Sequence, residues 1–148
     1  MKKLRLIILF VLFSCSQPDG EISKSYMAED ILLIDTHIDV PYRLWRQDLA
    51  GKQIEDISNS TLGDFDYDRA IKGGLDIPFF SIYLPAETEK LGTSFEMANK
   101  LIDMVEDIVS QYPDKFYLIK SVEQAKDFPK KGFVGIALGM ENGSPIQG

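Results

Sequence analysis

Ile31-Leu-Leu-Ile-Asp-Thr-His-Ile-Asp-Val-Pro41 is the stretch that decides the predicted fold. Its first four residues are apolar and predict a buried strand, which ends among Asp35, His37 and Asp39. Pro41 stands where a helix would start, because the first turn of a helix needs no N–H from that residue. Leu44, Trp45 and Leu49 follow at helical spacing on one apolar face. The stretch therefore predicts a strand that runs directly into a helix.

Three more apolar stretches predict strands, and one of them ends in an acidic residue. They are residues 75–84, 116–119 and 133–140, the last of which is followed by Glu141. Pro78 lacks the N–H that a sheet ladder uses, so we expect it near the start of its strand or at a bulge.

Helices are predicted between these strands from capping residues and apolar spacing. Asp66 caps a short helix that the glycines at 73 and 74 end. Thr93 and Glu96 form a capping box for a long amphipathic helix that ends before Pro113, and Ser121 and Gln124 form a second box. Pro129 and Gly132 end that last helix.

Apolar strands that alternate with helices are typical of a parallel sheet covered by helices. We therefore predict an α/β fold that forms the N-terminal part of a TIM-like (β/α)8 barrel with parallel strands. A closed barrel takes about 250 residues, so we expect the barrel to be incomplete in this chain. Residues 29–148 are assigned to this barrel domain.

The first residues have the pattern of an export signal. Met1-Lys-Lys-Leu-Arg5 is positively charged, residues 6–13 are apolar, and Ser14-Cys15 follows. The segment 12–15 resembles the lipobox of bacterial lipoproteins, in which cleavage before the cysteine leaves it N-terminal and lipid-modified. We therefore expect a lipoprotein signal peptide at 1–14, a lipid on Cys15 and a flexible tether at 15–28. A buried thiol is the alternative for Cys15.

Charge and cysteine content exclude other classes of protein. The net charge is −7, from 16 basic and 23 acidic residues, whereas a nucleic-acid binder normally carries a basic face. The chain contains one cysteine, so no internal disulfide can form. We expect an exported protein that is anchored to the bacterial cell envelope, on its periplasmic side or at the cell surface, without a nucleic-acid partner.

His37, Asp39 and Glu141 are the candidate metal ligands. Residues two apart on an extended segment point to the same side, so His37 and Asp39 converge at the end of the first strand. Glu141 follows the last apolar strand, and barrel enzymes place their active sites at this end of the strands. Imidazole and carboxylate groups suit zinc. A carboxylate at 141 could bridge two metal ions and so act in catalysis, in the hydrolysis of an amide or similar bond.

Structural roles are the alternatives for these three residues. His37 could be a hydrogen-bonded structural residue, Asp39 could cap the following helix, and Glu141 could pair with a surface lysine. Arg69 could orient the acids of the first strand or be solvated, and Trp45 could pack in the core or contact substrate. The glycines at 139 and 143 would let backbone or substrate come close to Glu141.

Three blocks of the sequence resemble the membrane dipeptidase (renal dipeptidase) family of zinc peptidases. The segment 34–41 resembles its Asp-x-His-x-Asp-x-Pro block, and 139–143 resembles its Gly-x-Glu-x-Gly block. Between them, 66–74 and the aromatic strand 79–83 are similar to its second block. The resemblance covers nearly everything from Ile31 to Gly148.

The resemblance implies a barrel with two zinc ions and a metal-bound hydroxide that hydrolyses dipeptides. It makes His37 and Asp39 ligands of the first zinc and Glu141 the bridging ligand. The family completes its second zinc with two later histidines, whereas His37 is the only histidine of this chain. We therefore expect the chain alone to be inactive. Some relatives have a histidine where this chain has Ser144.

Two other functions fit the same residues. One is another metal-dependent amidase on the same barrel, and the other is a metal-free lipoprotein that binds peptides. The expected partners are dipeptide substrates and, through the lipid anchor, a membrane. A homodimer is an assembly that the sequence leaves open.

Overall fold

The computed structural model describes residues 31–128 and 131–146. The predicted signal peptide at 1–14, Cys15, the tether at 15–28 and the helix stop at Pro129 lie outside the described residues. None of the helices within the described ranges combines the length and hydropathy that crossing a membrane requires.

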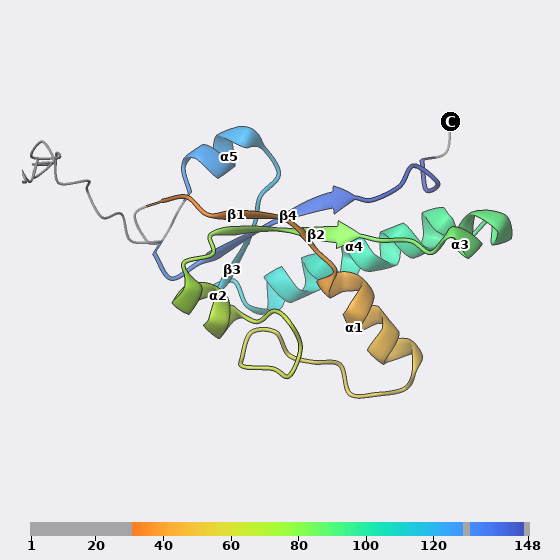
Figure 1. The fold of residues 1–148 in the computed structure, drawn as a ribbon, viewed down its shortest axis with the longest axis horizontal. Coiled ribbons are helices and arrows are strands. Elements are labelled where there is room, and N and C mark those ends of the chain that lie inside the picture. Colours follow the sequence, from red (N-terminus) through yellow and green to blue (C-terminus); the bar gives the residue numbers. More distant parts are fainter. Residues whose placement is uncertain (1–30, 129–130, 147–148) are drawn as a thin grey trace, which may run out of the picture.

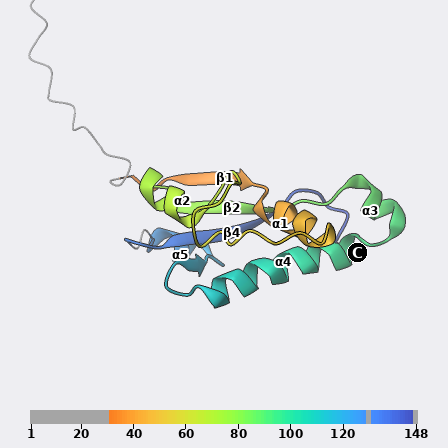
Figure 2. The ribbon, with the colours of Figure 1, turned by 90° about the horizontal axis from the view of Figure 1, so that it is seen from below.

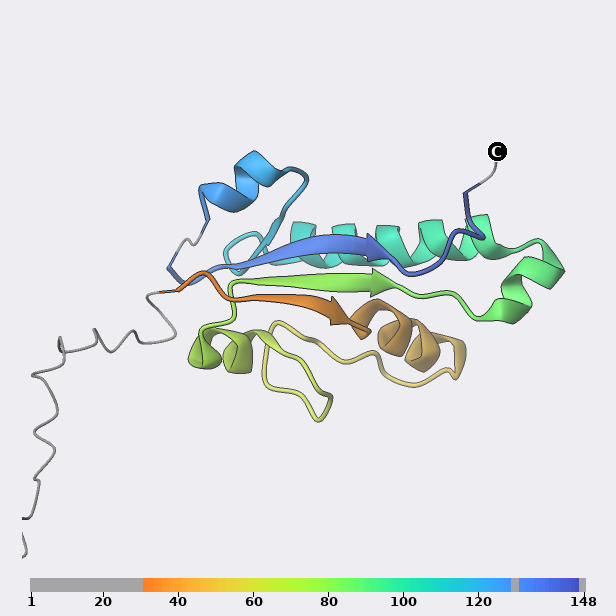
Figure 3. The same ribbon diagram turned by 45° about the horizontal axis from the view of Figure 1, so that its top comes forward.

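In the described part of the chain, four parallel strands form one sheet in the order β1-β2-β4-β3. They are β1 (Ile34–Ile38), β2 (Ile77–Ile82), β3 (Phe116–Leu118) and β4 (Val134–Met140). Figure 3 shows β1, β2 and β4 side by side with their arrowheads pointing the same way. Pro78 is the second residue of β2, as its missing N–H requires. Because all strands are parallel, their C-terminal ends meet at one edge of the sheet.

The first strand differs from its prediction in position and in burial. It begins at Ile34 rather than Ile31, and Ile34 is 40% exposed. The physical reason is its place in the sheet: β1 pairs only with β2, so its other edge has no neighbouring strand among the described residues. Leu33 is joined to the chain before β2, because its carbonyl accepts hydrogen bonds from the N–H groups of Asp76 and Ile77.

Within residues 31–128 and 131–146, five helices accompany the strands (Figure 1). They are α1 (Val40–Leu49), α2 (Tyr67–Gly73), α3 (Ala86–Leu91), α4 (Ser94–Gln111) and α5 (Val122–Lys126). The long helix α4 runs along one side of the sheet (Figure 2). The short helix α3 was not predicted, because six residues between Pro85 and Gly92 are too few to show helical spacing.

Two of the three predicted helix caps are present. The Asp66 carboxylate accepts the N–H of Arg69 at the start of α2, and the Ser121 hydroxyl accepts the N–H of Gln124 at the start of α5. The capping box predicted at Thr93 is wrong. Only Gly92 separates α3 from Thr93, whose N–H donates to the Thr88 carbonyl at 2.9 Å, so Thr93 belongs to the turn that closes α3 and its side chain makes no cap bond.

The hydrophobic core lies between the sheet and the helices. On one face, Phe80, Val134 and Ile136 are fully buried and pack with residues of α1, α2 and α4. Alternate strand residues face the opposite side, where Ile77 and Ala137 pack with Phe128.

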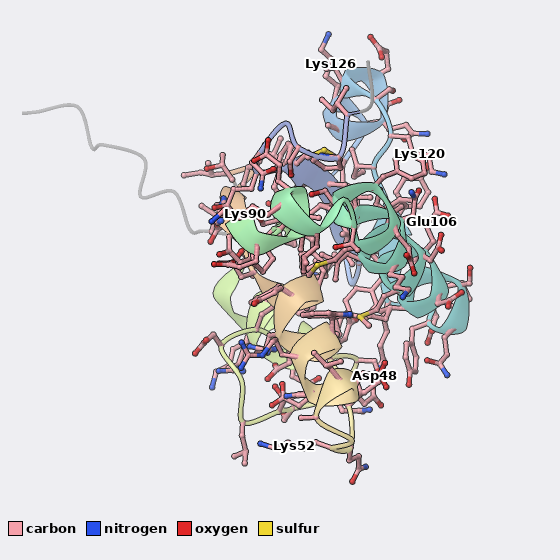
Figure 4. The ribbon with its side chains drawn as sticks, turned by 90° about the vertical axis from the view of Figure 1, so that its right-hand side faces the viewer. Asp48, Lys52, Lys90, Glu106, Lys120 and Lys126 are labelled. Atoms are coloured by element: carbon pink, nitrogen blue, oxygen red, sulfur yellow. The ribbon has the colours of Figure 1, made fainter. Side chains whose placement is uncertain are left out.

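Ion pairs on the surface join elements that are distant in the sequence. The Lys120 ammonium lies 3.2 Å from the Glu106 carboxylate, which joins the segment after β3 to α4 (Figure 4). Such exposed pairs contribute at most about 1 kcal/mol, so the apolar contacts hold these elements together.

Asp66 is a buried carboxylate at the N-terminal end of the sheet. Desolvation by burial raises its pKa, but hydrogen bonds from the N–H groups of Thr61 and Arg69 and the Arg69 guanidinium outweigh it and hold the pKa below the ordinary value. A lowered pKa in the folded state stabilises the fold above the pKa of the unfolded chain, about 3.9. This contribution is lost as the pH falls from there through the lowered pKa.

We expect Asp66→Asn to lower the free energy of unfolding by about 1–3 kcal/mol at pH 7, because an amide cannot pair with Arg69. The loss should shrink as the pH falls below about 4, because the carboxylate is then protonated first in the unfolded chain and, at still lower pH, in the folded protein. Urea unfolding at pH 7 and pH 3 measures both effects. Asp68→Asn, an exposed acid on the same helix, is the control and should change little. An equal loss at both pH values would contradict the role of the charge.

Candidate metal centre

His37 and Asp39 come together at the C-terminal end of β1. The His37 Nε2 atom lies 3.3 Å from Asp39 Oδ1. His37 is the fourth residue of the strand and Asp39 is the first residue after it. Because they are two residues apart, their side chains project from the same face of the strand. The Asp35 carboxylate accepts the backbone N–H of His37 at 3.0 Å and so holds this part of the strand.

Glu141 reaches the same point from β4. Its Oε2 atom lies 3.5 Å from His37 Nε2 and accepts a hydrogen bond from the Ser81 hydroxyl of β2 at 3.1 Å. One nitrogen and two oxygen atoms of His37, Asp39 and Glu141 all lie within 4.8 Å of one another. The three predicted residues therefore form one cluster at the edge where the strands end.

The spacing of these atoms fits a divalent cation. Zinc holds nitrogen and carboxylate ligands at about 2.0–2.1 Å, and tetrahedral ligands at that distance are about 3.3–3.4 Å apart. The separations of 3.3 Å and 3.5 Å from His37 Nε2 match this spacing. The side chains of His37 and Asp39 are 53% and 58% exposed, so one side of the cluster is open to solvent, as a catalytic metal site requires.

The structural roles considered for Asp39 and Glu141 are not seen in the described residues, whereas His37 lies within 3.5 Å of two carboxylates. Asp39 is at the N-cap position of α1, but its side chain makes no cap hydrogen bond. Glu141 contacts Ser81 and His37, and no lysine of the described ranges pairs with it. His37 lies on an exposed strand rather than in the core.

The segment after β4 is tied to the end of β2. The Asn142 side chain donates to the Leu84 carbonyl at 3.0 Å and accepts the backbone N–H of Ser144 at 3.0 Å. Ser144 is thus bound to Asn142. A hollow beside this segment has a volume of about 470 Å³ and is lined by residues after β2, of α3 and after β4, among them Tyr83, Glu89 and Gly143.

Other predicted participants lie elsewhere or are not needed for the cluster. Arg69 does not reach the acids of β1, because its guanidinium pairs with Asp66 at the opposite end of the sheet. Trp45 stacks on Tyr42 and packs against buried residues of β2 and α4, among them Ile82 and Leu101. A Cβ atom added at Gly139 would meet only a Phe79 side-chain carbon at 3.7 Å, and one at Gly143 would meet nothing within 4 Å. No tight approach to these glycines occurs in the described part of the chain.

Ser81 is the site residue that the sequence analysis missed. It is 3% exposed, and it is the only hydroxyl-bearing residue of β2. A lone polar residue within an apolar strand was the signal that could have found it, because buried hydroxyls need a hydrogen-bond partner.

Comparison with known proteins identifies the family. Residues 23–148 match the family described as membrane dipeptidase, peptidase family M19. This chain belongs to the membrane dipeptidase family. The family consists of metallo-dipeptidases and depends on zinc. Among curated proteins, the chain is 28% identical over 122 residues to dipeptidase 3 of Mus musculus, which covers 81% of this chain and 23% of the mouse protein.

Solved structures of the same family share the fold. Dipeptidase AC, a metallo peptidase of family M19, superposes with a TM-score of 0.60 at 19% identity over 78% of this chain and 38% of its own. A metallo peptidase from Rhodobacter sphaeroides, liganded with a phosphinate mimic of the dipeptide L-Ala-D-Ala, gives 0.61 at 19% identity over 78% and 39%. The chain thus spans less than half the length of these relatives. The prediction of an α/β chain that forms part of a barrel is confirmed.

We expect zinc ions to bind this cluster and to stabilise the fold. Zinc at about one hundred times its Kd should raise the free energy of unfolding by about 2.7 kcal/mol. His37→Ala and Asp39→Ala should each remove the effect, because each deletes a ligand. Calorimetric titration and thermal unfolding with and without zinc measure it. Asp48→Ala, which removes an exposed acid at the far end of α1, is the control, and equal zinc stabilisation of His37→Ala would contradict this site.

Proposed function

We propose that this protein is a zinc-dependent dipeptidase in which His37, Asp39 and Glu141 hold the metal. The observation that carries the proposal is the spacing of the three side chains, whose ligand atoms lie within 4.8 Å of one another at the C-terminal ends of β1 and β4. Membership of the membrane dipeptidase family supports the reaction class.

A bound zinc ion would polarise the scissile carbonyl of a dipeptide and lower the pKa of a water molecule. The residues of this chain hold and orient the reacting groups. His37 and Asp39 supply a neutral and an anionic ligand from one strand. Glu141 Oε2 faces His37, and its Oε1 has no hydrogen bond within the described residues, so that oxygen is free to contact a second ion.

Substrate would enter from the open side of the cluster. The loops after β2 and β4 border it, and the hydrogen bond from Asn142 to the Leu84 carbonyl holds these loops together. The mimic of L-Ala-D-Ala bound by the relative from Rhodobacter sphaeroides supports dipeptides as the substrate class of this protein as well. Ligands for a second metal ion and further groups of the pocket would come from other parts of a complete barrel. The proposed activity is therefore that of the longest natural form of the protein.

We expect Glu141→Gln to lower kcat/KM for dipeptide hydrolysis by about 100-fold or more in the longest natural form of the protein. The amide cannot supply an anionic oxygen to the metal, and changes even beyond the direct ligands of a metal site cost 10–100-fold. Glu106→Gln, an exposed change on α4, is the matched control. A chelator should abolish the wild-type rate, and added zinc should restore it.

Two results would count against this function. Hydrolysis that survives chelation and Glu141→Gln would contradict the metal mechanism. Dipeptide binding without any hydrolysis by the zinc-loaded protein would instead favour a peptide-binding lipoprotein.

We also propose that Cys15 carries a lipid that anchors the protein to the bacterial cell envelope. The support is the sequence alone: a basic start, an apolar run and a cysteine directly after Ser14. Cys15→Ser should move the protein from the membrane fraction to the soluble fraction, which fractionation of cells with immunoblotting measures. Mass spectrometry that finds an unmodified Cys15 within an uncleaved chain would contradict the anchor.

A further inference from the structure

Ser81 is the one hydroxyl side chain in direct contact with the candidate metal ligands in the described part of the chain. It lies near the end of β2, is 3% exposed, and donates a hydrogen bond to Glu141 Oε2 at 3.1 Å. Among the described residues its side chain has no other hydrogen-bond partner. We propose that Ser81 is a positioning residue that orients Glu141 for metal binding, an inference that rests on the proposed function.

The order of the strands places Ser81 between the two sources of ligands. β2 lies between β1, which carries His37, and β4, which leads to Glu141. Neighbouring strands are about 4.8 Å apart, so His37 and Glu141 must reach across β2 to come within 3.5 Å of each other. A large side chain at position 81 would occupy that space, whereas serine leaves it open and still offers a donor.

Sheet hydrogen bonds hold the backbone near Glu141 in place, but they do not hold the Glu141 side chain. Ser81 is in register with Gly139, and the N–H of Glu141 donates to the Ile82 carbonyl at 3.4 Å. The Glu141 side chain is 36% exposed and could turn toward solvent. The Ser81 hydroxyl holds the same carboxylate oxygen that faces His37, so it selects the rotamer that completes the cluster.

Repulsion between carboxylates makes this restraint necessary. Ligand oxygens of the Asp39 and Glu141 carboxylates lie within 4.8 Å of each other, and like charges at this distance repel. Before a cation binds, this repulsion favours rotamers that move Glu141 away from Asp39. The hydrogen bond from Ser81 opposes that movement and keeps the site ready for the metal.

The test compares Ser81→Thr with Ser81→Val. Threonine and valine have nearly the same shape, but threonine keeps the hydroxyl that valine replaces with a methyl group. Calorimetric titration with zinc alone should give Ser81→Thr an affinity near that of wild type. Ser81→Val should bind zinc about 10–100-fold more weakly, the range found for groups that orient metal ligands. The visible spectrum of the cobalt-loaded protein should change in the same variant, because it reports the arrangement of the ligands.

Ser94→Ala is the matched control. Ser94 is also a buried serine, 4% exposed, whose hydroxyl lies 2.9 Å from the Thr88 hydroxyl, away from the cluster. The Ser94→Ala variant should be less stable than wild type, but its zinc affinity and the spectrum of its cobalt-loaded form should be unchanged. Equal zinc affinity in Ser81→Thr and Ser81→Val, both folded by circular dichroism, would overturn the positioning role.

The same experiment separates this proposal from the proposed function. If wild type binds zinc and His37→Ala does not, but Ser81→Val binds as tightly as Ser81→Thr, only the role of Ser81 fails. If wild type binds no zinc, the proposed function fails and the role of Ser81 fails with it.

Discussion

Parallel pairing of β1, β2 and β4 is the constraint on which the site depends. Parallel strands end at the same edge of a sheet, and the order β1-β2-β4 leaves one strand between the two that supply ligands. Side chains as long as histidine and glutamate can cross that one strand, and they could not cross two. The site therefore forms because His37 and Glu141, more than one hundred positions apart in the sequence, lie at the ends of β1 and β4, which only β2 separates.

Much of this arrangement could be predicted from local sequence. Apolar runs that alternate with amphipathic helices indicated the parallel sheet, and the acids and histidine at the ends of two runs indicated where a site would form. His37 and Asp39 are two residues apart, so the direction of their side chains follows from strand geometry alone. Glu141 was a candidate ligand because it follows the last apolar strand, and the resemblance to a known family added its bridging role; the order of the strands, which brings it close to His37, does not follow from local sequence.

The parts that could not be predicted depend on tertiary neighbours. The exposure of β1 results from its edge position, and the turn at Thr93 results from a short helix that ends two residues earlier, at Leu91. Arg69 is an exception, because its pairing with Asp66, three residues earlier, is a local contact that the helix start itself could have indicated. The contact between Ser81 and Glu141 joins β2 to the end of β4 and needs the register of the sheet.

The central claim is that three side chains meet around one cation. Crystals of the protein grown with zinc, measured on both sides of the zinc absorption edge, test it most directly. The account predicts an anomalous peak about 2.0–2.2 Å from His37 Nε2 and from carboxylate oxygens of Asp39 and Glu141. A peak bound elsewhere, or an imidazole that holds the two carboxylates with no metal between them at saturating zinc, would contradict it.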